Sequence, residues 1–73
     1  MKGVIRFLKL NGFKHIEKNS YATDSGCNVV IEKDGYAVAD SEGGTMYSKD
    51  HNIYWLIGVL TYYGYINKNY NQP

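Results

Sequence analysis

The side chains best suited to nucleophilic or metal chemistry are few in this 73-residue chain, and they lie far apart. Cys27 is the single cysteine, and His15 and His51 are the two histidines. No two of these residues share a spacing such as C-x-x-C or H-x-x-x-H, which places two ligands on one metal ion. Cys27 also falls on the predicted core face of a strand, where a free cysteine acts as a small hydrophobic residue. We therefore expect no catalytic site, no metal site and no cofactor.

A basic stripe near the start of the chain is a second candidate for chemistry. Lys2, Arg6 and Lys9 are spaced i, i+4, i+7, which puts them on one side of a helix. They could contact phosphates or an acidic partner. However, the net charge is only +1, and nucleic-acid modules usually carry a larger basic excess with interleaved aromatic residues. We expect a solvated helix face here and keep nucleic-acid binding as the alternative function.

The C-terminal third of the chain is hydrophobic on more sides than one core contact needs. Ile53, Leu56, Ile57 and Leu60 give the i, i+3, i+4, i+7 stripe of a helix that faces a core. The helix carries further apolar and aromatic residues outside this stripe: Tyr54, Trp55, Val59, Tyr62 and Tyr63. Tyrosine and tryptophan are enriched at interface hot spots, and the chain has eight tyrosines. These five residues are the predicted protein-interaction surface.

Two interpretations of this surface stay open. In one, Val4, Phe7 and Leu8 of a first helix cover it within the monomer. In the other, it binds a protein partner or a second copy of the chain. Gly58 lies among the aromatic residues and would let another backbone approach closely.

The elements that must position these residues begin with a short N-terminal helix. Val4, Phe7 and Leu8 stack on one side of it. With Gly12 at the C′ position, Phe13 lies at C″ and Leu8 at C3, the pair that makes the hydrophobic contact of a Schellman ending.

The middle of the chain is predicted to be an antiparallel meander. A first strand lies within residues 14–21, and two more strands run over residues 27–33 and 36–40. A turn at residues 41–44 leads to a short last strand at residues 45–47.

The dipeptide Asp34-Gly35 sets the predicted register of the central hairpin, because it is typical of a two-residue type I′ turn. It places Ile31 opposite Val38 and Val29 opposite Asp40. The side chains that then share the better core face are Cys27, Val29, Ile31 and Val38.

The C-terminal helix has clear signals at both ends. Ser48 or Asp50 is the predicted N-cap, because a side-chain oxygen there can accept from the free amides of the first turn. Gly64 ends the helix, and Tyr65 at C″ can contact Leu60 at C3.

Together these elements predict an α+β fold with a short N-terminal helix, an antiparallel meander of three to four strands, and a C-terminal helix packed on one face of the sheet. Residues 1–66 are the predicted single domain, and residues 67–73 are a polar C-terminal tail. The lone cysteine predicts a reducing compartment. The longest apolar run, residues 53–66, is shorter than the roughly 20 residues of a membrane-spanning helix. We expect a cytoplasmic location and no membrane contact.

Two parts of the sequence resemble small uncharacterised proteins of gut Bacteroidales and of their phages and mobile elements. One part runs from Asn52 to Gly58 and on to 63–66, and the other comprises residues 7–9 and 11–13. The resemblance implies a phage or mobile-element accessory protein that acts in the host cytoplasm. Such proteins often bind and obstruct a host protein, including defence components. The resemblance transfers no functional residue, and we expect a non-enzymatic protein-interaction module.

Overall fold

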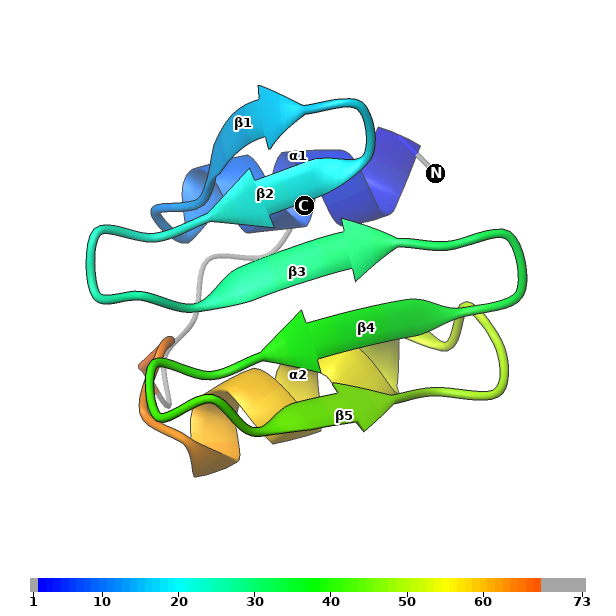
Figure 1. The fold of residues 1–73 in the computed structure, drawn as a ribbon. Helices are drawn as coiled ribbons and strands as arrows, with labels where there is room; N and C mark the ends of the chain where they lie inside the picture. The colour runs from blue at the N-terminus through cyan, green and yellow to red at the C-terminus, as the bar shows by residue number, and fades with distance from the viewer. Residues whose placement is uncertain (1, 68–73) are drawn as a thin grey trace.

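The computed structural model describes residues 2–67, with Lys2 described by its backbone alone. The elements in chain order are α1 (Lys2–Leu10), β1 (Lys14–Glu17), β2 (Ser20–Ala22), β3 (Asn28–Ile31), β4 (Tyr36–Ala39), β5 (Thr45–Tyr47) and α2 (Ile53–Tyr62) (Figure 1). The chain therefore has the predicted α+β class. Apart from Asn67, the predicted polar tail lies outside the described residues.

The sheet has five strands, where the sequence predicted three or four. All pairings are antiparallel, in the order β1-β2-β3-β4-β5. The segment that was expected to contain one strand folds into the β1–β2 hairpin. Its turn has no glycine signal, because the residue with positive φ is Lys18 (φ 40°). His15 Nε2 lies 2.6 Å from the carbonyl oxygen of Lys18 and holds this turn together.

The β3–β4 hairpin differs from its predicted register by two residues. Ile31 lies opposite Tyr36, and Val29 lies opposite Val38. Both pairs join apolar side chains, whereas the predicted register placed Asp40 opposite Val29. Hydrophobic pairing across the strands therefore outweighs the turn signal. Because the shift is two residues, every side chain keeps its predicted face of the sheet.

Gly35 serves packing and does not form the predicted type I′ turn. The glycines with positive φ in residues 2–67 are Gly12, Gly26, Gly43 and Gly64. A Cβ added to Gly35 would lie 2.5 Å from the carbonyl oxygen of Ser48 and 3.0 Å from that of Asp50. The segment that follows β5 passes directly against Gly35. It is held there by the N–H of Tyr36, which donates to Ser48 Oγ (2.7 Å).

The C-terminal ends of both helices are as predicted. The N–H of Phe13 donates to the carbonyl of Leu8 (2.9 Å), and Gly12 has φ +91°. After α2, the N–H of Tyr65 donates to the carbonyl of Leu60 (2.9 Å). These are the bonds from C″ to C3 that define a Schellman ending.

The start of α2 corrects the predicted N-cap. The cap is Asn52, whose Oδ1 accepts from the N–H of Tyr54 (2.9 Å). Asp50 forms its side-chain hydrogen bond before the helix begins, since its Oδ1 accepts from the N–H of Asn52 (3.1 Å). Ser48 bonds to β4 and to the carbonyl of Asp50 instead.

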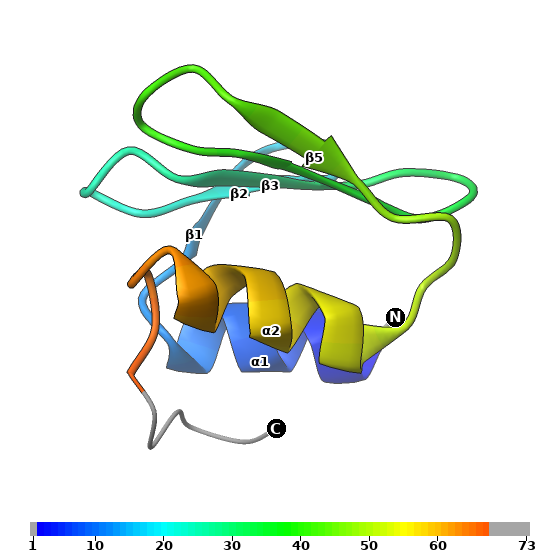
Figure 2. The same cartoon turned by 90° about the horizontal axis from the view of Figure 1, so that it is seen from below.

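The two helices lie on the same side of the sheet (Figure 2). Figure 1 shows α1 behind β1 and β2, and α2 behind β4 and β5. The largest fully buried side chains come from the helices, the strands and the segments between them: Tyr36, Phe7, Phe13, Leu8, Leu56, Leu60, Val29, Val38 and Cys27. The opposite face of the sheet is left open by the described elements. Neither helix has the length and apolar character needed to cross a bilayer.

Candidate protein-interaction surface

The tyrosines fall into a structural group and an exposed group. Tyr21 and Tyr36 are buried in the core. Tyr65 is half-buried, and its hydroxyl oxygen accepts from the N–H of Ser41 (2.8 Å). Tyr70 lies outside the described residues. The exposed tyrosines are Tyr47, Tyr54, Tyr62 and Tyr63. Three of these four belong to α2 and its C-cap, so the exposed aromatic area is concentrated on one element.

The solvent-facing line of α2 consists of two tyrosines with a glycine between them. Tyr54 is 76% exposed and Tyr62 is 82% exposed, and Gly58 lies about one helical turn from each. Within residues 2–67, no atom lies within 4 Å of a Cβ built on Gly58. Glycine inside a helix costs about 1 kcal/mol relative to alanine. No contact among the described residues requires this glycine.

The flank of this line is only partly open. Trp55 and Val59 are half-buried and pack against the hydrophobic core. Tyr63 is exposed, and its ring meets that of Tyr62 edge-on, with the ring centroids 4.9 Å apart. We call Tyr54, Trp55, Val59, Tyr62 and Tyr63 the α2 aromatic surface, with Gly58 in its middle.

α1 does not cover the outer part of this surface. Val4, Phe7 and Leu8, which could have covered it, are buried in the core cluster instead. Tyr54 and Tyr62 remain in solvent. The interpretation that the monomer covers this surface therefore fails for its two most prominent side chains.

The α2 aromatic surface carries no carboxylate, ammonium, guanidinium or imidazole group. Residues 52–67 contain no Asp, Glu, Lys, Arg or His. The polar groups that it offers are the tyrosine hydroxyls and the indole N–H of Trp55. Such a surface binds through apolar area and a few hydrogen bonds, as the centre of a protein–protein interface does.

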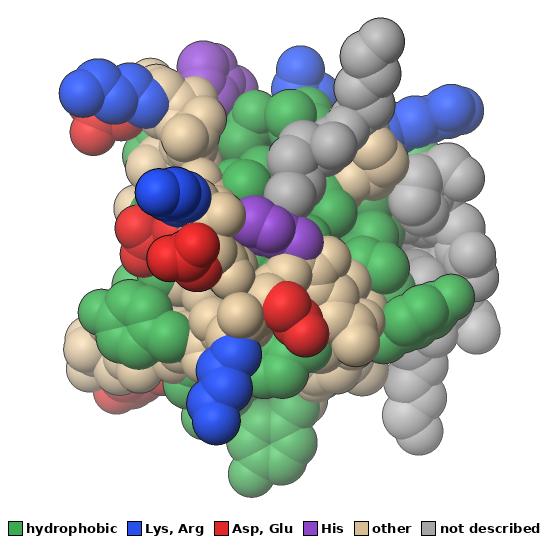
Figure 3. Space-filling view, turned by 90° about the vertical axis from the view of Figure 1, so that its right-hand side faces the viewer, with side chains coloured by type: hydrophobic (Ala, Val, Ile, Leu, Met, Phe, Trp, Pro, Cys, Tyr) green, Lys and Arg blue, Asp and Glu red, His purple; other side chains and the backbone are tan. Residues whose placement is uncertain are grey.

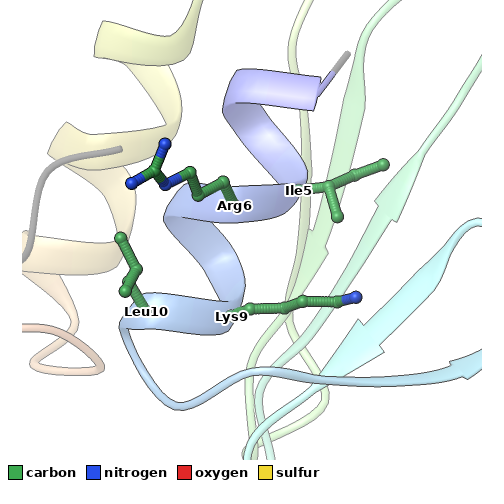
Figure 4. Close-up of a pocket in the computed structure, with 4 residues that line it drawn as sticks. All are labelled: Ile5, Arg6, Lys9 and Leu10. Atoms are coloured by element: carbon green, nitrogen blue, oxygen red, sulfur yellow. The ribbon is translucent and has the colours of Figure 1, made fainter.

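The predicted basic stripe on α1 does not point in one direction. Arg6 and Lys9 are both exposed, and the side chain of Lys2 lies outside the described residues. Figure 4 shows Arg6 and Leu10 pointing toward α2, whereas Lys9 and Ile5 point away from it. The open hollow of about 380 Å³ at these residues therefore has its two cations on opposite sides. This arrangement does not direct both charges at one phosphate.

The residues with nucleophilic or ligand chemistry are engaged in the structure. Cys27 is fully buried, and its burial, with a smaller contribution from Asp40, raises its pKa to about 11. At neutral pH the reactive thiolate is therefore a negligible fraction. His51 Nε2 lies 2.7 Å from the carbonyl oxygen of Glu32, and its ring meets Tyr36 edge-on. Residues 2–67 hold no group of three His, Cys, Asp or Glu side chains placed to bind a metal ion.

A mixed hollow of about 410 Å³ lies beside this histidine. Its lining comes from α1, the β1–β2 turn, the end of β3 and the approach to α2: Ile5, Asn19, Ile31, Glu32, Lys33 and His51. Figure 3 shows histidine, acidic and basic side chains together on one side of the molecule. Because the ring nitrogen of His51 bonds to the main chain of Glu32, the imidazole holds the start of α2 against β3.

The open face of the sheet is a second surface, which was not among the predicted binding surfaces. Its residues follow from the strand register, and all but the buried Ala37 are at least partly exposed: Ser20, Ala22, Asn28, Val30, Ala37, Ala39, Thr45 and Tyr47. Val30, Ala37 and Ala39 lie on this face because they alternate along β3 and β4 with the core residues Val29 and Val38. The contributions of β2 and β5 depend on the β1–β2 hairpin and on the observed register, which no local signal specified. The face is uncharged from β2 to β5, and apart from Tyr47 its side chains are small or medium-sized.

Comparison of the chain with protein-family models, with curated proteins and with solved structures gives no match. Its function is therefore inferred from its own residues.

Proposed function

We propose that this protein is a non-enzymatic protein-interaction module that binds its partner through the α2 aromatic surface. The observation that carries the proposal is the pair Tyr54 and Tyr62, each more than three-quarters exposed on an uncharged helix. Burying apolar area contributes about 25 cal/mol per Å², and one aromatic side chain buries about 150–250 Å². These two residues could therefore supply a large part of the affinity for a partner.

The partner that we propose is a host protein, which the module binds and obstructs in the host cytoplasm. Support for a phage or mobile-element origin comes from the sequence resemblance of residues 52–58 and 63–66 to small proteins of gut Bacteroidales. The cytoplasmic location is supported by the free, buried thiol of Cys27, since a lone thiol suits a reducing compartment.

Nucleic-acid binding through α1 receives less support than protein binding. Arg6 and Lys9 point to opposite sides of the helix (Figure 4), and three of the four exposed tyrosines among the described residues lie on α2 and its C-cap. Stacking and phosphate contacts usually act side by side in single-strand binding.

The proposal is tested by comparing the proteins that three immobilised forms retain from a Bacteroidales lysate. The wild type should retain a host protein, and Tyr54→Ser combined with Tyr62→Ser should lose it. Tyr47→Ser is the matched control, because Tyr47 is 69% exposed but lies on β5. Its retention should equal that of the wild type. Equal retention by the doubly substituted form, with an unchanged circular dichroism spectrum, would refute the proposed surface.

A further inference from the structure

We infer that, in the free protein, a second copy of this chain occupies the α2 aromatic surface in a two-fold symmetric contact centred on Gly58. The inference rests on the proposed function, because it names the partner that fits the same surface. In this contact the two α2 helices cross antiparallel, with the Gly58 residues facing each other. Tyr54 of each copy then lies next to Tyr62 of the other.

The symmetry of the residue pattern supports a second copy over an unrelated partner. A two-fold contact is isologous, so the surface must be complementary to itself. Tyr54 and Tyr62 lie four residues on either side of Gly58, so the sequence of large, small and large residues is the same in both directions. An antiparallel crossing thus pairs tyrosine with tyrosine on both sides of the axis. A heterologous partner would place no such requirement on the helix.

Gly58 explains how closely the two helices can approach. It is exposed, and no atom of the described part of the chain lies within 4 Å of a Cβ placed on it. A glycine in the middle of a helix has no side chain to keep another backbone away. The tyrosines on either side extend beyond the glycine and would enclose the facing helix. The unfavourable helix propensity of Gly58, which no contact among residues 2–67 requires, is explained by this approach.

The charges of the chain also allow self-association at this surface. Two copies that meet through a charged patch repel each other, and like charges brought together at an interface cost affinity. Residues 52–67 contain no Asp, Glu, Lys, Arg or His, so this surface meets its own copy without repulsion between charged side chains. The basic and acidic side chains of the chain lie before residue 52 or after residue 67.

The available area predicts a reversible dimer. The exposed fractions of Tyr54, Tyr62 and Tyr63 are 76%, 82% and 44%, which together amount to about 400 Å² at about 200 Å² per aromatic side chain. Trp55, Gly58 and Val59 add to this, so each copy can bury about 500–600 Å². Stable complexes bury about 800 Å² per partner. The dimer should therefore lie near the weak end of specific interfaces, with a Kd of about micromolar or higher.

A consequence is that the dimer and a host complex exclude each other. Both use Tyr54 and Tyr62, so a host protein binds one copy only after the dimer separates. A complex with the host protein should therefore contain a single copy of this chain.

The test is sedimentation of the full chain over a concentration series from about 1 µM to about 1 mM. The mass of the wild type should rise from 8.3 kDa toward twice that value. Gly58→Ala should weaken the dimer by about tenfold or more, because two methyl groups then meet at the symmetry axis. The same substitution should raise the melting temperature of the monomer, measured at the lowest concentration, by about 5 °C. Stability and association should thus change in opposite directions.

Gly3→Ala is the matched control. Gly3 is an exposed glycine in α1 that also has no atom within 4 Å of an added Cβ, and its substitution should leave the Kd of the dimer unchanged. A wild type that stays at 8.3 kDa throughout overturns the inference. A Gly58→Ala form that gains stability with an unchanged Kd also overturns it.

The failure of this inference is distinguishable from the failure of the proposed function. Suppose that the wild type is monomeric but the form with both tyrosine substitutions loses the host protein. The inferred dimer is then wrong, and the proposed function stands. Suppose instead that the dimer forms and is weakened by Gly58→Ala, but the tyrosine substitutions leave retention of the host protein unchanged. The inferred dimer then stands, and the proposal that this surface binds a host protein is wrong.

Discussion

Among the described residues, Thr61 and Asn28 each bury a side-chain oxygen that has no hydrogen-bond partner. A buried polar atom without a partner costs about 1–3 kcal/mol. Thr61 lies in α2, and valine has the same shape without the hydroxyl. We therefore expect Thr61→Val to raise the free energy of unfolding by about 1 kcal/mol. In urea denaturation the midpoint should rise while the m-value stays constant.

Thr23 provides the matched substitution for this prediction. Its Oγ1 accepts from the N–H of Cys27 (3.1 Å) and bonds to Ser25 Oγ (2.8 Å). Thr23→Val should therefore lower the free energy of unfolding by about 1 kcal/mol, because the bonds are lost. If both substitutions shift the midpoint in the same direction, the hydroxyl of Thr61 has a role that the observed contacts do not explain.

At the scale of single residues, the sequence identified the exposed part of the candidate surface and missed how far it extends. Tyr54, Tyr62 and Tyr63 are exposed as a binding surface requires. Trp55 and Val59 were assigned to the same surface but are half-buried against the core. Helical periodicity gives the angle of a residue around its own axis. It does not specify how far the neighbouring strands reach, so the border between core and surface could not be predicted.

At the scale of elements, the C-terminal ends of the helices were predictable, whereas the register of the central hairpin was not. A Schellman ending depends on residues within one turn, and Gly12 and Gly64 met that local requirement. The register of β3 and β4 depends instead on the side-chain pairs between the two strands and on the segment that packs against the turn. The apolar pairs Ile31 with Tyr36 and Val29 with Val38 fix the register. Asp34-Gly35 then lies in a longer connection and does not form the predicted two-residue turn.

The position of Gly35 gives a prediction at this scale. A methyl group there would meet the carbonyl oxygen of Ser48 at 2.5 Å and its Oγ at 2.7 Å. Gly35→Ala must therefore displace the segment between β5 and α2 and break the bond from Tyr36 to Ser48. We expect a loss of about 2 kcal/mol in the free energy of unfolding, measured by urea denaturation.

Gly58→Ala is the comparison for Gly35→Ala, since the space around Gly58 is open. At a concentration where the protein is monomeric, it should gain about 0.5–1 kcal/mol from helix propensity. A Gly35→Ala form as stable as the wild type would mean that the chain after β5 does not pack against this turn.

At the scale of the whole molecule, charge and aromatic area are separated. Residues 1–18 carry five basic side chains and one acidic one, whereas residues 19–50 carry two basic and six acidic ones. Residues 52–67 carry none. Because α1 and α2 lie on the same side of the sheet (Figure 2), the basic helix and the uncharged helix are presented together. The sequence indicated this separation along the chain, but the relative placement of the helices depends on the folded sheet.

This separation predicts how binding should respond to salt. Raising the sodium chloride concentration from about 50 mM to about 500 mM screens charged contacts strongly, but contacts through Tyr54, Gly58 and Tyr62 involve no charge. The Kd of the dimer should therefore stay within about twofold or become tighter, because salts that are excluded from apolar surface strengthen its burial. Sedimentation of the wild type at both concentrations measures this response. Weakening by about tenfold or more would instead place Arg6 and Lys9 in the contact, since binding that depends on cations falls steeply with salt. In that case Arg6→Gln should weaken association more than Tyr62→Ser, and the binding surface would have to be moved from α2 to α1.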